Sequence, residues 1–178
     1  MNKLKLDTRS IALIAVMVAV TCIITMFARI PMAQEYIHCG DIAANFVAVA
    51  FGPWFGLIVA GGGMALADLL GYPQWAIPTF VIHGLQGFVV GYIAYLGRRS
   101  IASLFAGAIV GEIIVIVGYF LVGWIMTGLP AATAMLPFNG FQGVLGLLGV
   151  PLFVMVARAY PPLLRRGGSR AGSTDIDH

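Results

Sequence analysis

One acidic residue interrupts an otherwise apolar stretch of the chain. Glu112 lies near the middle of residues 101–126, a segment that contains no lysine or arginine. A buried carboxyl group without a basic partner must carry a proton or bind another group, because an unpaired charge is costly in an apolar medium. Glu112 is therefore the strongest predicted ligand-binding residue.

Two further pairs of polar residues have helical spacing. His83 and Gln86 are three residues apart, as are Asn139 and Gln142, so each pair shares one face of a helix. A lone histidine in an apolar segment is more often a satisfied interior group, but the pairing of His83 with Gln86 makes a binding role an equal alternative, and we include both among the predicted ligand-binding residues. A carboxylate, a histidine and amides together suit a small polar heteroaromatic ring that carries hydrogen-bond donors.

Other polar and aromatic residues allow a structural or a functional interpretation. Asp68 precedes the turn at 71–73 and either caps a helix or contacts a ligand, and Asp41 has the position of an N-cap. Tyr36 and Trp75 either anchor the chain at a membrane surface or stack on a ring. We also include His38, in the polar segment 29–39, among the predicted ligand-binding residues.

Several kinds of chemistry are not indicated. Cys22 and Cys39 lack CxxC spacing, so neither a metal site nor a disulfide is predicted. The chain has no HExxH motif and no GxxxxGK[ST] phosphate loop, so we expect neither an enzyme nor an ATPase, and no cofactor.

The composition is that of a membrane protein. Of the 178 residues, 60% are hydrophobic and only 10% are charged, whereas about a quarter is usual in soluble domains. At roughly 20 residues for each span, the chain can hold six membrane helices. We predict an all-α, six-span bundle forming one domain, 1–160, and a disordered tail, 161–178. The predicted spans are 11–28, 40–51, 54–70, 79–96, 101–126 and 139–159, with loops at 29–39 and 127–138.

The hairpin at 40–73 organises the predicted bundle. Its helices meet at the break Phe51-Gly52-Pro53, and Gly61-Gly62-Gly63 gives the second helix a small-residue face suited to close packing in lipid. The segment 40–51 is too short to cross about 30 Å of hydrocarbon unaided.

Basic residues predict the orientation. If both termini are cytoplasmic, nine of the ten lysines and arginines lie inside and only Arg29 lies outside. Most polar residues then fall in the outer half of the membrane. A channel would need polar groups throughout its length, so this asymmetry favours a pocket open to the outside over a self-sufficient facilitator.

The order of these features resembles the S components of energy-coupling factor (ECF) vitamin transporters, most closely the riboflavin-type group. The resemblance covers roughly residues 8–160. It depends on Ala15 and Ala19, Gly40-Asp41, the break at 51–53, Gly61-Gly62-Gly63, and the run from Ala67 to Pro73.

The resemblance implies a prokaryotic plasma-membrane protein that binds a vitamin from outside. It implies docking on a membrane coupling subunit driven by two cytoplasmic ATPases, with Ala15 and Ala19 as contact residues. It places the ligand between the first external loop and the outer ends of spans four to six, where His38, Trp75, His83, Gln86, Glu112, Asn139 and Gln142 lie. Riboflavin carriers tend to use a basic residue on the last span, whereas spans five and six of this chain have no internal lysine or arginine, so hydroxymethylpyrimidine or a form of vitamin B6 is favoured. Riboflavin or another vitamin remains the alternative.

Overall fold

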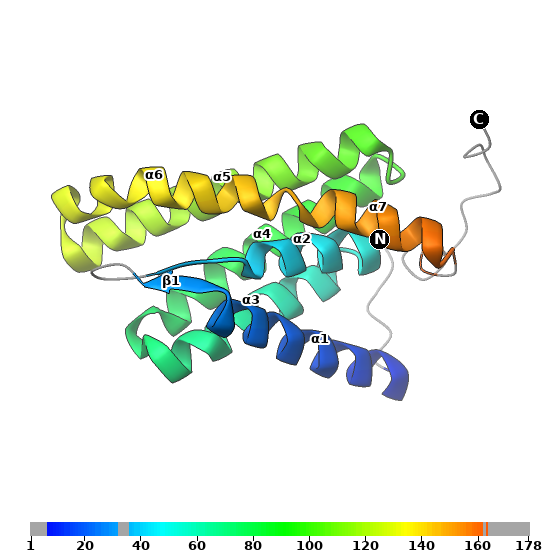
Figure 1. The fold of residues 1–178 in the computed structure, drawn as a ribbon, viewed down its shortest axis with the longest axis horizontal. Coiled ribbons are helices and arrows are strands. Elements are labelled where there is room, and N and C mark those ends of the chain that lie inside the picture. The colour runs from blue at the N-terminus through cyan, green and yellow to red at the C-terminus, as the bar shows by residue number, and fades with distance from the viewer. Residues whose placement is uncertain (1–6, 32–35, 162, 164–178) are drawn as a thin grey trace.

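The protein is an elongated bundle of nearly parallel helices with one short β-hairpin (Figure 1). The computed structural model describes residues 7–31, 36–161 and 163, so the predicted tail lies almost wholly outside the described residues. The described elements are α1 Thr8–Phe27, β1 Arg29–Pro31, β2 Tyr36–His38, α2 Gly40–Phe51, α3 Pro53–Gly71, the 3-10 helix η1 Pro73–Trp75, α4 Ala76–Leu96, α5 Ile101–Thr127, α6 Leu129–Gly146 and α7 Gly149–Ala159.

The helices account for six membrane spans. Within the described residues, five helical segments are long and apolar enough to cross a membrane: α1, α3, η1 with α4, α5, and α6 with α7. The sixth span is α2, which has only 12 residues. Large apolar side chains remain exposed on the outside of the bundle, including Phe27, Ile77 and Ile125, each at least 80% exposed. Such a surface fits lipid and not water.

Local residue chemistry sets the helix boundaries. The side chain of Asp7 accepts a hydrogen bond from the Ser10 amide at 2.8 Å and so caps α1. At the predicted break, Gly52 has φ of 94°, and Pro53 follows in the first turn of α3. Glycine adopts this left-handed backbone without steric cost, and proline is well suited to a first turn.

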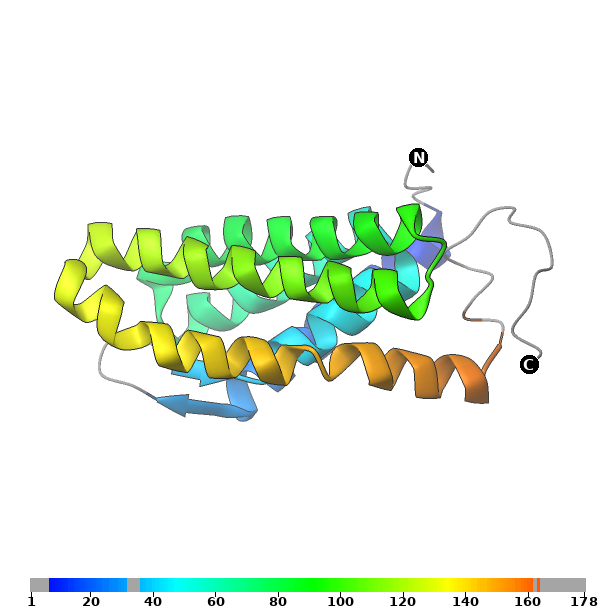
Figure 2. The same ribbon diagram turned by 90° about the horizontal axis from the view of Figure 1, so that it is seen from above.

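The sixth span differs from its prediction, because α6 begins at Leu129 and not at residue 139. The segment 127–138 was predicted as a loop on account of its two prolines. Pro130 lies in the first turn, where its missing N–H is not needed, and Pro137 is accommodated inside a helix that packs along α5 (Figure 2). The span is instead interrupted at Leu147–Leu148, between α6 and α7.

The polar segment before α2 also departs from its prediction as a loop, since its described ends form an antiparallel hairpin. Arg29 pairs with His38, and Ile30 pairs with Ile37. Cross-strand pairs of β-branched side chains stabilise such a pairing. The guanidinium of Arg29 lies 5.1 Å from the ring centroid of Tyr36, which adds a cation–π contact across the strands.

Glycines bring the helices into close contact. A Cβ atom on Gly56 would lie 2.2 Å from the Gly87 carbonyl oxygen, so α3 and α4 touch backbone to backbone. Gly61 contributes to the same interface, and Gly63 packs against Thr21 of α1. The small-residue face predicted for α3 is therefore used in packing.

The bundle has an apolar end and a polar end. The apolar core includes Val90, Leu104, Val150 and Phe153, from α4, α5 and α7, all at most 2% exposed. The hairpin and the α5–α6 turn lie at the opposite end of the bundle from the α4–α5 turn and α7 (Figure 1). The buried polar residues are grouped toward the hairpin end.

Candidate functional site

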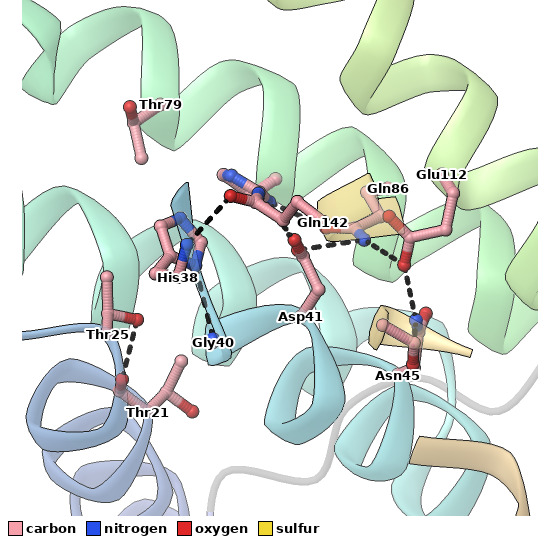
Figure 3. A network of polar contacts seen from close by, with 12 residues as sticks. Thr21, Thr25, His38, Gly40, Asp41, Asn45, Thr79, Gln86, Glu112 and Gln142 are labelled. Atoms are coloured by element: carbon pink, nitrogen blue, oxygen red, sulfur yellow. Dashed lines mark hydrogen bonds and ion pairs between the residues drawn. The ribbon is translucent and has the colours of Figure 1, made fainter. Parts of the chain in front are cut away.

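Buried polar side chains from several helices meet inside the bundle, close to the hairpin (Figure 3). They come from β2 and from helices α2 to α6, which are distant in sequence. All are less than 9% exposed: His38, Asp41, Asn45, Asp68, Thr79, His83, Gln86, Glu112, Asn139 and Gln142. They form two connected layers, an inner hydrogen-bond network and an outer cavity.

Asp41 is the centre of the inner network. Its carboxylate accepts hydrogen bonds from Gln142 Nε2 at 2.7 Å and from Gln86 Nε2 at 3.1 Å. His83 Nδ1 lies 3.2 Å from Asp41 Oδ1 and 2.7 Å from Gln86 Oε1. Both neighbours are acceptors, so Nδ1 carries a proton. The N-cap interpretation of Asp41 is wrong, because its side chain bonds to residues of other helices.

Glu112 extends this network toward α6. Its Oε1 atom accepts hydrogen bonds from Gln86 Nε2 at 3.1 Å and from Asn45 Nδ2 at 2.6 Å. Asn45 Nδ2 also donates to the Gly146 carbonyl at 2.9 Å, at the end of α6. Glu112 Oε2, Asn45 Oδ1 and His83 Nε2 are buried, and none of them has a hydrogen-bond partner among the residues that the structure describes. Unused polar capacity of this kind is uncommon in a folded interior.

The outer layer surrounds a cavity of about 20 Å³. This volume holds about one water molecule, so a vitamin can enter only if the walls separate. The lining residues within the described part of the chain are polar or aromatic: Tyr36, His38, Asp68, Trp75, Tyr119, Asn139 and Gln142.

Hydroxyl groups hold Asp68 at the wall of the cavity. Tyr36 donates to Asp68 Oδ1, and Thr79 donates to Asp68 Oδ2 at 2.5 Å. Thr79 also lies 2.6 Å from the hydroxyl of Tyr119. The Trp75 ring lies 5.7 Å from the Tyr119 ring, which places two aromatic surfaces beside this carboxylate.

The hairpin supplies the other side of the cavity. The backbone N–H of His38 donates to Gln142 Oε1 at 2.9 Å, and His38 Nδ1 accepts from the Gly40 amide at 3.1 Å. Burial lowers the pKa of His38 to about 4, so its imidazole is neutral at physiological pH. Burial, together with the Asp68 carboxylate, raises the pKa of Tyr36, which stays a neutral phenol.

The structure therefore brings the eight predicted binding residues into one connected region. Five of them line the cavity: His38, Asp68, Trp75, Asn139 and Gln142. The other three, His83, Gln86 and Glu112, lie in the inner network and do not line it.

Asn45, Thr79 and Tyr119 were not predicted from the sequence. Asp41 was interpreted only as an N-cap, and Tyr36 was weighed but not included among the predicted binding residues. Asn45 and Thr79 are single polar residues within apolar segments, and that exception to the local pattern is the signal that could have identified them. Among the residues that the structure describes, no group of three or more His, Cys, Asp or Glu side chains could hold a metal ion.

The predicted docking residues lie apart from this site. Ala15 and Ala19 are exposed on α1, whose opposite side packs on α3 through Thr21 and its neighbours. Their exposure leaves them available to a partner in the membrane, so the docking role stays a prediction.

Comparison with known families decides the class of protein. The family model described as the ECF-type riboflavin transporter, S component, matches residues 5–158, which is most of the chain. The chain belongs to this family. It is therefore a multi-pass membrane protein of the prokaryotic plasma membrane, and a subunit of a vitamin transporter, not an enzyme.

Individual relatives agree with the family. A Pyrococcus woesei protein whose description states no function is 37% identical over 143 residues, covering 79% of this chain and 96% of that protein. The thiamine precursor transporter HmpT of Lactococcus lactis subsp. cremoris is 26% identical over 166 residues, covering 91% of each. The crystal structure of FolT bound with folic acid has the same fold, with a TM-score of 0.58 and 20% identity over 83% of this chain and 98% of that one.

Proposed function

We propose that this S component binds hydroxymethylpyrimidine or a form of vitamin B6 from outside the cell. The observation that carries the proposal is the cavity at the hairpin end of the bundle, where every described lining residue has a polar or aromatic side chain. Aromatic walls with a few convergent polar groups are typical of sites for small ring-shaped ligands.

Two further observations favour a small ring over riboflavin. The described helices α5 and α6 contain no lysine or arginine that could reach the ligand from the last spans. The relative HmpT is described as a transporter of a thiamine precursor, which supports the same class of ligand here. A cavity of about 20 Å³ must also expand less for one ring than for the three fused rings of riboflavin.

We further propose that uptake requires partner subunits. The S component docks through Ala15 and Ala19 on a membrane coupling subunit, and two cytoplasmic ATPases supply the energy. The chain has no phosphate loop, so ATP hydrolysis is assigned to the partners.

Ligand binding to the purified chain tests the proposal. Mass spectrometry of the molecule that co-purifies should detect hydroxymethylpyrimidine or a B6 form. Titration with each compound should quench or shift the fluorescence of Trp75, which lines the cavity, and a Trp75→Phe variant should lose that signal. Trp124, which is half exposed on α5, provides the control: Trp124→Phe should keep it. Tight binding of riboflavin without binding of the smaller rings would overturn the proposal.

A further inference from the structure

The hydroxyl protons around Asp68 all have assigned acceptors. Thr79 has one proton, which it donates to Asp68 Oδ2. In the 2.6 Å contact between Thr79 and Tyr119, Tyr119 must therefore be the donor. Tyr36 donates its proton to Asp68 Oδ1. None of these three hydroxyl groups retains a proton for a ligand.

This leaves one wall of the cavity with acceptors only. Asp68, Tyr36 and Tyr119 all line the cavity, and each keeps unused oxygen lone pairs. In the part of the chain that the structure describes, no lysine or arginine forms a salt bridge with Asp68. A ligand group that meets this wall must therefore donate hydrogen bonds.

The rest of the polar lining includes hydrogen-bond donors. His38 Nδ1 accepts from the Gly40 amide, so the proton of the neutral imidazole is on Nε2, a donor. Asn139 makes no hydrogen bond to another described residue, and its amide can both donate and accept. The cavity thus suits a ring that has donors on one edge and an acceptor elsewhere.

We propose that Asp68 recognises an amino group of the transported ring, and that the Tyr119–Thr79 hydroxyl pair and Tyr36 fix the carboxylate for this role. The ligand class is then an amino-substituted heteroaromatic ring, stacked near Trp75 and Tyr119. This inference depends on the proposed function, since it assigns the contacts within that ligand site.

The arrangement also explains how a close analogue is rejected. If a carbonyl group replaced the amino group, its oxygen would face the oxygens of Asp68, Tyr36 and Tyr119. No proton would lie between them, and the buried acceptors would be left unpaired. Sites that hydrogen-bond a substrate group discriminate strongly against analogues that lack it.

The test compares hydroxymethylpyrimidine with its oxo analogue, in which a carbonyl group replaces the amino group. Calorimetric titration of the purified chain should show the amino compound binding at least about 100-fold more tightly. In Asp68→Asn, the amino compound should bind at least about tenfold more weakly, and the preference over the oxo analogue should shrink by a similar factor, because an amide offers fewer acceptor sites.

Milder variants keep the test decisive if Asp68→Asn fails to fold. Thr79→Val and Tyr36→Phe each remove one hydroxyl that orients the carboxylate, and both should reduce the amino-over-oxo preference. Thr133→Val and Tyr95→Phe are matched controls, since both side chains are exposed and neither lines the cavity. The controls should bind both compounds as the unmodified chain does.

The outcomes separate this inference from the proposed function. If the amino compound binds and the preference is unchanged in Asp68→Asn, Thr79→Val and Tyr36→Phe, the role of Asp68 is wrong and the proposed function stands. If pyridoxine binds and hydroxymethylpyrimidine does not, the amino-group assignment is also overturned. If neither compound binds, the proposed function itself fails.

Discussion

At the scale of single residues, the two buried acids of the inner network have different surroundings. Asp41 accepts hydrogen bonds from Gln86 and Gln142 and has His83 beside it, so both of its oxygens are used. Glu112 has donors at Oε1 only, and its Oε2 atom is without a partner. Replacing a buried oxygen that has no hydrogen-bond partner by an N–H₂ group is costly, because the new donor has no acceptor.

Glu112→Gln should weaken ligand binding at least tenfold, on the order of 1.4 kcal/mol. If the new amide nitrogen replaces Oε1, the donors on Asn45 and Gln86 lose their acceptor. If it replaces Oε2, a buried N–H₂ group has no acceptor. Either arrangement disturbs the network that supports Gln142 at the cavity wall.

The measurement is the dissociation constant of the purified variant, with its melting temperature recorded alongside. Unchanged affinity in a well-folded variant would remove Glu112 from the site. A lost melting transition would instead assign Glu112 a role in folding.

Glu112 could be singled out from the sequence, because it is an acid within an apolar segment, whereas Asp41 was interpreted only as an N-cap. The sequence could not show which side chains form hydrogen bonds with each acid. Asn45 joins Glu112 to the end of α6 across about a hundred residues of chain, and no local pattern encodes that contact. Tyr119 was missed for a different reason: an aromatic residue in a membrane helix usually faces lipid or packing partners, and only the fold shows that its hydroxyl meets Thr79.

At the scale of elements, the interruption between α6 and α7 lies next to the inner network. Gly143 and Gly146 of α6 face Glu112, which leaves room for its carboxyl group. A Cβ atom on Gly146 would lie 2.2 Å from Glu112 Oε1 and 2.8 Å from the Asp41 Cβ atom. The absence of side chains on this face is thus a requirement of the site.

Gly146→Ala should therefore weaken ligand binding and lower the melting temperature of the purified protein. The added methyl group must displace Glu112 from Asn45 and Gln86, and overpacking of a filled interior typically costs about 1–3 kcal/mol. Gly140→Ala is the matched control on the same helix, because a Cβ atom there meets nothing within 4 Å. The control should be neutral or slightly stabilising, since alanine favours helix. Equal effects of the two variants would contradict this role of the glycine face.

Some element boundaries could be predicted from the sequence and others could not. The Gly52–Pro53 break was predictable because both residues have strong backbone preferences. The start of α6 was not, because Pro130 and Pro137 indicate a loop locally while packing along α5 keeps the segment helical. The β1–β2 hairpin was likewise not predicted, since its three-residue strands are too short to show a pattern.

At the scale of the whole molecule, the polar site and the apolar core lie in series along the bundle. The cavity and its network lie toward the hairpin, and the cluster around Val90, Leu104 and Phe153 closes the other half. With cytoplasmic termini, as the basic residues predict, we expect the ligand to enter from outside, and residues 7–31 and 36–161 offer it no polar route through the bundle. Release inside then requires a movement of the whole subunit or of its helices, which a partner must drive.

The exposed alanines of α1 are where we expect that partner to act. Replacing Ala15 and Ala19 together by leucine should abolish uptake in vesicles that contain the coupling subunit and the ATPases. Bulky side chains would prevent the close approach of helices that small residues allow in lipid. Binding to the isolated chain should stay unchanged, because neither residue lines the cavity.

The chain contains a matched control for this double substitution. Ala102 and Ala106 are also four residues apart and exposed, but they lie on α5. Their replacement by leucine should preserve both binding and uptake if docking is confined to α1. Loss of binding in the α1 variant would indicate a structural role for these alanines. Equal loss of uptake in both variants would mean that the bundle tolerates no bulk on either face, and the surface of α1 would then have no special part in coupling.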